Sequence, residues 1–120
     1  MNRRTALAAL WTLVIFAGCS LPGDAIRSFD IFTPDKLYHI AAFVGYGLLW
    51  LWAEVRPKVV VVSGLAFALF IEAWQHVMPI GRFADPWDTL ADAVGLGLAL
   101  WTWHVARKAK EERMERAEQR

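Results

Sequence analysis

Four continuous apolar stretches divide the chain, and short polar segments separate them. The stretches run from Thr5 to Leu21, from Leu37 to Ala53, from Val59 to Met78 and from Thr89 to Ala106. Each contains about 17 to 20 residues, close to the shortest helix that crosses the hydrocarbon core of a bilayer. The valines of Val59–Val62 favour a strand by propensity alone, but a helix satisfies its own backbone groups inside lipid. The pattern therefore predicts an all-α fold, a membrane-spanning four-helix bundle.

Helix-breaking and small residues support this division. Proline interrupts helices, and all five prolines lie between or at the edges of the stretches, at Pro22, Pro34, Pro57, Pro79 and Pro86. Small residues four apart let membrane helices approach closely. They occur here as Ala41 and Gly45, Ala91 and Gly95, and Ala93 and Gly97, with Gly64 in the third stretch. We expect a compact bundle.

Composition agrees with a membrane protein and excludes several classes of site. The 120 residues have room for one domain, and 57% of them are hydrophobic, above the usual share for a soluble domain. A single cysteine, Cys19, excludes an intramolecular disulfide and a cysteine-based zinc cluster. Basic residues flank the apolar stretches instead of lining a face with aromatic residues, so no nucleic-acid partner is expected.

The distribution of lysine and arginine predicts the orientation. Positive residues accumulate on the cytoplasmic side of membrane proteins. In the predicted topology ten of them share one side, namely Arg3, Arg4, Arg56, Lys58, Arg107, Lys108, Lys110, Arg113, Arg116 and Arg120, and three lie opposite, namely Arg27, Lys36 and Arg82. Both termini are therefore expected in the cytoplasm. Trp50, Trp52, Trp101 and Trp103 would form an aromatic belt at the inner interface.

The two ends of the chain each allow two interpretations. Residues 107–120 form a charged tail after a transmembrane domain of residues 1–106, and Lys108, Glu112 and Arg116 are spaced for i,i+4 pairs in a cytoplasmic helical extension. A tail that binds a partner is the alternative. At the other end, Phe16–Ser20 resembles a lipoprotein cleavage site before Cys19. Phe16 stands where that motif usually has an aliphatic residue, so we favour an uncleaved first helix over lipidation of Cys19.

Polar residues concentrate at one end of three predicted helices. Asp35, Lys36 and His39 enter the second helix from its outer end, Glu72, Gln75 and His76 leave the third helix toward the same side, and Asp88 and Asp92 begin the fourth, while Arg82 and Asp85 lie in the preceding loop. Glu72 precedes Pro79 by seven residues, which places it roughly 10 Å below the helix end. Ionisable groups at this depth are functional candidates. We expect them to line an outward-facing cleft.

Structural roles compete with this interpretation for several of these residues. Asp35 and Asp88 could each cap a helix. Gln75 could be an interhelical hydrogen-bonding strut, and His76 could be a hydrated interfacial residue. Glu72 and Asp92 have no such explanation, so they either pair internally or face a wet cleft.

The order of these residues resembles the VanZ-like family of small membrane proteins. Asp35-Lys36-Leu37-Tyr38-His39 is similar to the family's DKxxH segment, and Glu72-Ala73-Trp74-Gln75 with Pro79 is similar to its ExxQ…P segment. Gly81-Arg82 with Asp85, Asp88 and Gly95 is similar to its third segment, although Asp92 stands where the family often has asparagine. The resemblance implies a multi-pass protein of the bacterial inner membrane. The family's namesake is linked to low-level resistance to the glycopeptide teicoplanin.

Three functions are compatible with the sequence. The first is an accessory or resistance-like protein that binds a polar headgroup, a cell-envelope lipid precursor or a glycopeptide-type antibiotic, with Lys36 and Arg82 holding a phosphate or carboxylate. The second is a membrane-embedded hydrolase or phosphoryl-transfer enzyme, with Glu72, His39, His76 and Asp92 as acid–base candidates. The third is proton or ion transport, which four short helices would support only as an oligomer. No metal-spacing motif is present in the sequence, and neither a metal nor another cofactor is predicted; membrane lipids are the expected surroundings.

Overall fold

The computed structural model describes residues 1–21, 34–79 and 86–120, and these form four helices without a strand. The helices are α1 (Arg3–Cys19), α3 (Pro34–Trp52), α4 (Pro57–Val77) and α5 (Pro86–Glu118). The predicted all-α fold with four helices is confirmed, and the Val59–Val62 run is helical.

Helix boundaries follow the prolines and one tight turn. Three of the helices begin at a proline, a residue suited to the first helical position because its missing N–H would have no partner there. Between α3 and α4, the N–H of Val55 donates to the carbonyl of Trp50 (3.1 Å) and that of Glu54 to Leu51 (2.9 Å). This pattern ends a helix with a residue in the left-handed conformation, and Glu54 adopts it with φ of 67°.

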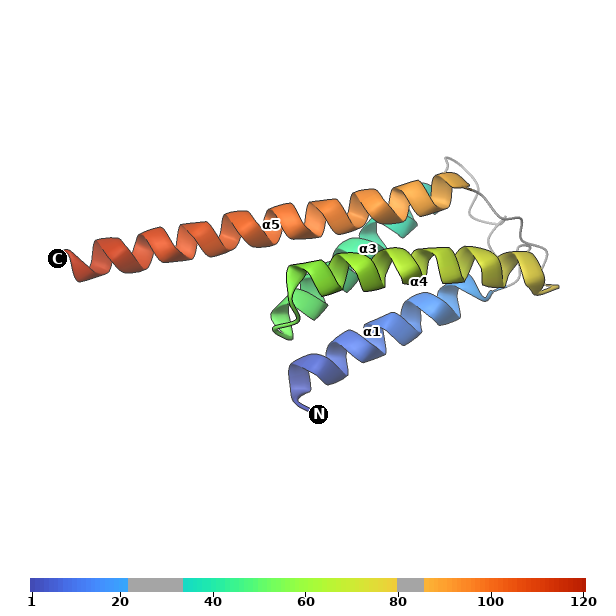
Figure 1. Ribbon diagram of the computed structural model, residues 1–120, viewed down its shortest axis with the longest axis horizontal. Coiled ribbons are helices and arrows are strands. Elements are labelled where there is room, and N and C mark those ends of the chain that lie inside the picture. Colours follow the sequence, from blue (N-terminus) through green and yellow to red (C-terminus); the bar gives the residue numbers. More distant parts are fainter. Residues whose placement is uncertain (22–33, 80–85) are drawn as a thin grey trace.

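The helices alternate in direction, so their ends gather at two opposite poles (Figure 1). One pole holds the start of α1 and the α3–α4 turn. The other holds the end of α1, the start of α3, the end of α4 and the start of α5. Of the polar residues singled out in the sequence, those that the structure describes lie on the helix ends of this second pole, which we call the polar pole.

The core is apolar and aromatic, and glycines set its closest contacts. Phe43 lies at its centre, with ring centroids 5.8 Å from Tyr46 and 5.9 Å from Phe67. A β-carbon on Gly95 would lie 2.5 Å from the carbonyl oxygen of Ile40, so α3 and α5 are in near backbone contact there. Gly97 faces open space. The small-residue prediction is therefore right for Gly95 and wrong for Gly97.

Large apolar side chains are exposed along all four helices. They include Leu10 and Leu13 on α1, Leu37 on α3, Val62, Leu69 and Phe70 on α4, and Leu90, Val94 and Trp101 on α5. Among the described helices, α4 (Pro57–Val77) alone meets both the length and the hydropathy expected of a membrane span. α1 has 17 residues, and α3 and α5 carry charged residues in their first turns. Four membrane-spanning helices were predicted, and one described helix meets these criteria. Whether the other three helices span a membrane stays a prediction.

Helix α5 continues without a break through the charged tail and projects past the other helices (Figure 1). The predicted helical extension is confirmed, but its pairing register is wrong. In this described segment the ion pair joins Arg107 Nε to Glu111 Oε1 at 3.5 Å, and Lys108, Glu112 and Arg116 form no such pairs. The actual pair lies one residue earlier on the same helix.

Candidate functional site

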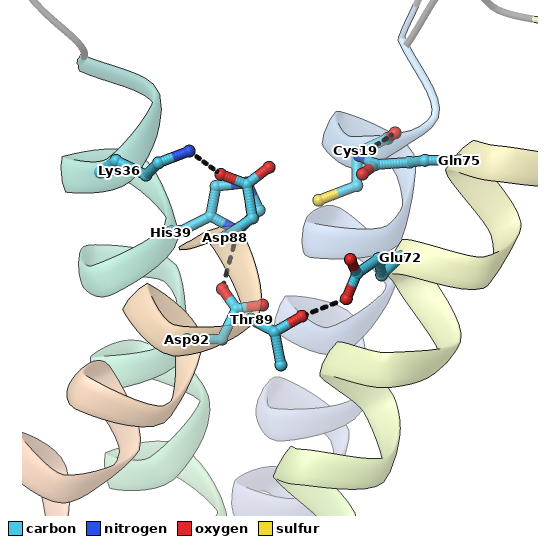
Figure 2. A network of polar contacts seen from close by, with 8 residues as sticks. All are labelled: Cys19, Lys36, His39, Glu72, Gln75, Asp88, Thr89 and Asp92. Atoms are coloured by element: carbon cyan, nitrogen blue, oxygen red, sulfur yellow. Dashed lines mark hydrogen bonds and ion pairs between the residues drawn. The ribbon is translucent and has the colours of Figure 1, made fainter. Parts of the chain in front are cut away.

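The first two turns of α5 carry the centre of a polar network. Asp88 and Asp92 are four residues apart and Thr89 is three before Asp92, so all three project from neighbouring faces of the helix. Asp88 and Asp92 reach α3, and Thr89 reaches α4 (Figure 2). Helix α5 therefore links α3 to α4 at the polar pole.

An ion pair forms the outer part of this network. Lys36 Nζ donates to Asp88 Oδ1 at 2.5 Å, with 30% and 13% of the two side chains exposed. Asp88 lies in the first turn of α5, where the helix dipole also favours a negative charge. A helix cap was one alternative for Asp88, and the contact that the structure shows is with a cation from α3.

His39 connects this ion pair to a buried carboxylate. Its Nδ1 lies 2.7 Å from Asp92 Oδ1, and its Nε2 lies 3.7 Å from Asp88 Oδ2. When Asp92 is ionised, its carboxylate can only accept hydrogen bonds, so Nδ1 is then the donor. Asp92 is 2% exposed and His39 is 7% exposed, so the two groups are removed from solvent together. An imidazole held by a buried carboxylate in this way has a fixed orientation.

Glu72 makes a polar contact between α4 and α5. The hydroxyl of Thr89 donates to Glu72 Oε2 at 2.5 Å. Sequence reasoning treated Thr89 only as the start of an apolar stretch. Its position three residues before Asp92, on the face already assigned to the site, was the signal that could have identified it.

Gln75 forms a hydrogen bond between two helices and is not a member of this network. Its Nε2 donates to the backbone carbonyl of Cys19 at 3.0 Å, and only 4% of the residue is exposed. This contact agrees with the alternative that Gln75 is an interhelical hydrogen-bonding residue. It joins α4 to the end of α1, one helical turn beyond Glu72 (Figure 2).

Other predicted site residues lie apart or outside the described part of the chain. His76 is exposed on the last turn of α4 and makes no hydrogen bond or ion pair with the described residues. Asp35 belongs to the first turn of α3, but its side chain lies outside the description, as do Arg82 and Asp85 entirely. The structure thus brings together Lys36, His39, Glu72, Asp88 and Asp92.

The network contains the groups needed for ion binding and for proton transfer. Its carboxylates are Glu72, Asp88 and Asp92, and its cationic or protonatable groups are Lys36 and His39. In the described residues no buried side-chain nitrogen or oxygen is without a hydrogen-bond partner, and no three His, Cys, Asp or Glu side chains form a group suited to a metal ion.

Two hollows formed by described residues lie away from the polar pole. One is lined by His104, Arg107, Lys108 and Glu111, and the other by Asn2, Arg3, Arg4 and Glu54. The segments 22–33 and 80–85, which adjoin the polar pole in sequence, lie outside the described residues. The outward-facing cleft remains a prediction.

Comparison with known proteins identifies one family. The family model described as VanZ/LLP1 matches residues 2–107. No curated protein and no solved structure matches the chain.

Proposed function

Because this chain belongs to the VanZ/LLP1 family, we propose that it is a multi-pass inner-membrane protein which binds a polar headgroup at its polar pole. The observation that carries this proposal is the convergence of Lys36, His39, Glu72, Asp88 and Asp92 from three helices. The role is that of an accessory or resistance-like protein in the cell envelope.

Two features of the chain support membrane embedding. Soluble monomers rarely expose large continuous apolar surfaces, whereas all four helices here expose large apolar side chains. The ten-to-three distribution of positive residues supports a cytoplasmic location for both termini. The polar pole then faces the extracytoplasmic side, and residues 107–120 form a cytoplasmic tail.

Cysteine labelling tests this orientation. In a Cys19→Ser background, single cysteines are introduced by Arg27→Cys and Arg113→Cys. A membrane-impermeant maleimide added to intact cells is expected to label the first protein and not the second, while both react after the membrane is opened. Labelling of the Arg113→Cys protein in intact cells, with the other unlabelled, would invert the proposed topology.

Energetic cost makes a purely structural role for the network a poor explanation. Buried ion pairs seldom stabilise a fold more than apolar residues of the same volume. Apolar side chains would hold α3, α4 and α5 together at least as well. The retention of an ion pair, a histidine–carboxylate pair and a further carboxylate at one pole therefore favours a ligand-binding role.

The charge balance favours a ligand that carries an amine. Lys36 is paired with Asp88, and His39 with Asp92, whereas Glu72 receives a bond from the neutral hydroxyl of Thr89. Among the described residues, Glu72 is thus the carboxylate of this network that no Lys, Arg or His side chain contacts. A protonated amine beside Glu72 would complete the balance. Arg82 stays the candidate for the ligand's phosphate, which makes a zwitterionic headgroup the best fit.

Replacing one carboxylate oxygen of Glu72 with an amide group tests the proposed binding of a zwitterionic headgroup. Glu72→Gln is expected to weaken retention of phosphatidylethanolamine by about tenfold to a hundredfold, because a charge-assisted hydrogen bond contributes about 1.5–3 kcal/mol. Retention of phosphatidylglycerol should change little. Native mass spectrometry of the detergent-purified protein, titrated with each lipid, measures both.

The matched control removes a carboxylate at the opposite pole. Glu54→Gln changes the partner of Arg4, 3.0 Å away, and should leave the preference for phosphatidylethanolamine as in the wild type. Equal retention of both lipids by the wild type, or equal preference in wild type and Glu72→Gln, would contradict the proposal.

The histidine–carboxylate pair favours an enzyme as the second candidate. An imidazole oriented through Nδ1 by a carboxylate is the usual arrangement of a general base, and His39 with Asp92 has it. Loss of the headgroup from bound lipid over time, abolished by His39→Gln while lipid binding persists, would favour the enzyme over the pure binding protein.

A further inference from the structure

We propose that residues 1–18 remain in the folded protein as a permanent wall of the bundle, and that Cys19 keeps an unmodified thiol. The sequence around Cys19 resembles a site where a lipid is attached and the preceding residues are removed. The contacts of α1 contradict this processing. The inference does not depend on the ligand proposed above.

The amino-terminal half of α1 is attached to the α3–α4 turn. The side chain of Asn2 caps the helix by accepting a hydrogen bond from the N–H of Thr5 at 2.9 Å. Arg4 donates to Glu54 Oε1 at 3.0 Å, and its guanidinium lies 5.3 Å from the ring centroid of Trp52. Each contact is modest for exposed groups, but together they fix the position of α1 relative to α3.

The middle of α1 is built into the core. The indole N–H of Trp11 donates to the carbonyl of Ala42 at 2.9 Å. A β-carbon on Gly45 would lie 2.7 Å from that indole nitrogen, so α3 provides a glycine where the tryptophan packs. Ala8 and Ile15 are 1% and 5% exposed. A signal segment destined for removal has no need for such complementarity with the mature protein.

The carboxyl end of α1 is attached to α4 around the bond that would be cut. Buried Gln75 donates to the carbonyl of Cys19, and the indole of Trp74 donates to Ser20 Oγ at 3.1 Å. The Phe16 ring lies 5.3 Å from that of Trp74. The Gly18–Cys19 bond lies within the helix, and cleavage of a backbone bond requires local unfolding of such structure.

Removal of residues 1–18 would take away part of the core and one hydrogen-bond partner of α3. The core would lose Ile15, and Trp50 would lose the Thr12 hydroxyl that accepts its indole hydrogen bond at 3.1 Å. Loss of buried apolar groups and of hydrogen-bond partners would destabilise the remaining helices. Trp74 and Gln75 of the ExxQ segment are therefore positioning residues that keep the end of α1 beside the polar pole.

Intact-mass spectrometry of the full chain tests this inference. The protein, with a carboxyl-terminal tag, is purified from bacterial membranes, and a host lipoprotein from the same cells shows that the processing enzymes are active. We expect residues 1–18 to be present, no added lipid mass, and one thiol that reacts with maleimide after denaturation. A protein that begins at Cys19 and carries a diacylglyceryl group would overturn the inference.

The variant Phe16→Leu separates protection by packing from a poor recognition sequence. It places an aliphatic residue where the cleavage motif usually has one and leaves the Gln75–Cys19 bond in place. If packing protects the bond, this variant also retains residues 1–18. The variant also removes the ring contact with Trp74. Its processing in cells where the wild type stays intact would show that the remaining contacts of α1 do not prevent cleavage, which would overturn protection by the bundle.

Discussion

Asp92→Leu is expected to lower the free energy of unfolding by about 3–5 kcal/mol, the usual cost of removing one member of a buried ion pair. Asp92 is the most buried member of the network, and its carboxylate accepts a hydrogen bond from His39 at 2.7 Å. Leucine has the same number of side-chain heavy atoms and the same branching at Cγ, but it provides no acceptor. Nδ1 of His39 would then stay buried with a hydrogen it cannot donate, and α3 would lose its deepest polar contact with α5.

Two further variants show whether the loss of stability comes from breaking the His39–Asp92 pair or from replacing Asp92 itself. Asp92→Asn keeps an acceptor oxygen for His39, so its loss of stability should be about 1–2 kcal/mol, the difference between a charged and a neutral hydrogen bond. The double variant His39→Leu with Asp92→Leu removes both members and should recover most of the stability. The measurement is unfolding of the purified protein in mixed micelles by SDS titration, followed by tryptophan fluorescence. Equal stability of wild type and Asp92→Leu would refute the assigned pair.

The double variant also separates stability from function. A folded protein that lacks the His39–Asp92 pair should lose headgroup selectivity if the pair belongs to the binding site. Native-like unfolding together with native-like lipid retention would reduce the pair to an interhelical contact. The conclusion about the ligand would then depend on Glu72 alone.

The helices could be predicted because the signals for them are local. Prolines Pro34, Pro57 and Pro86 begin three of them, and continuous apolar stretches fill their interiors. The gathering of Lys36, Glu72 and Asp88 at one pole also follows from connectivity alone, because consecutive helices joined by short turns alternate in direction. That part of the candidate site needed no knowledge of packing.

The pairings within the site could not be predicted because they depend on how each helix is rotated about its axis. Glu72 was expected to pair internally or to face a wet cleft, and the sequence did not indicate that Thr89 is the residue that donates to it. His76 is one residue beyond Gln75, and this 100° step around a helix leaves it exposed while Gln75 is buried. The same limit applies to the tail, where Arg107 rather than Lys108 forms the ion pair.

Gly95→Ala is expected to be strongly destabilising. Gly95 and Gly97 show most clearly how the contacts of a residue depend on the rotation of its helix about the helix axis. The added methyl group would lie 2.5 Å from the carbonyl oxygen of Ile40 and 3.0 Å from the β-carbon of Phe43. A carbon and an oxygen normally stay about 3.3 Å or more apart, so α3 and α5 must separate by about 1 Å. Overpacking of this kind costs about 1–3 kcal/mol. Ile40 follows His39 directly, so the same displacement would lengthen the His39–Asp92 hydrogen bond and weaken headgroup binding as well.

Gly97→Ala provides the matched control on the same helix. Nothing lies within 4 Å of the added carbon, and alanine is favoured over glycine inside a helix by about 0.5–1 kcal/mol. The two substitutions add the same atom two residues apart, yet they should change the free energy of unfolding in opposite directions. SDS titration measures both, and lipid retention should fall only for Gly95→Ala. Because helix propensity affects both positions alike, a difference in sign can come only from contact between α3 and α5. Equal effects of the two variants would mean that α5 is rotated away from the orientation that joins Asp92 to His39.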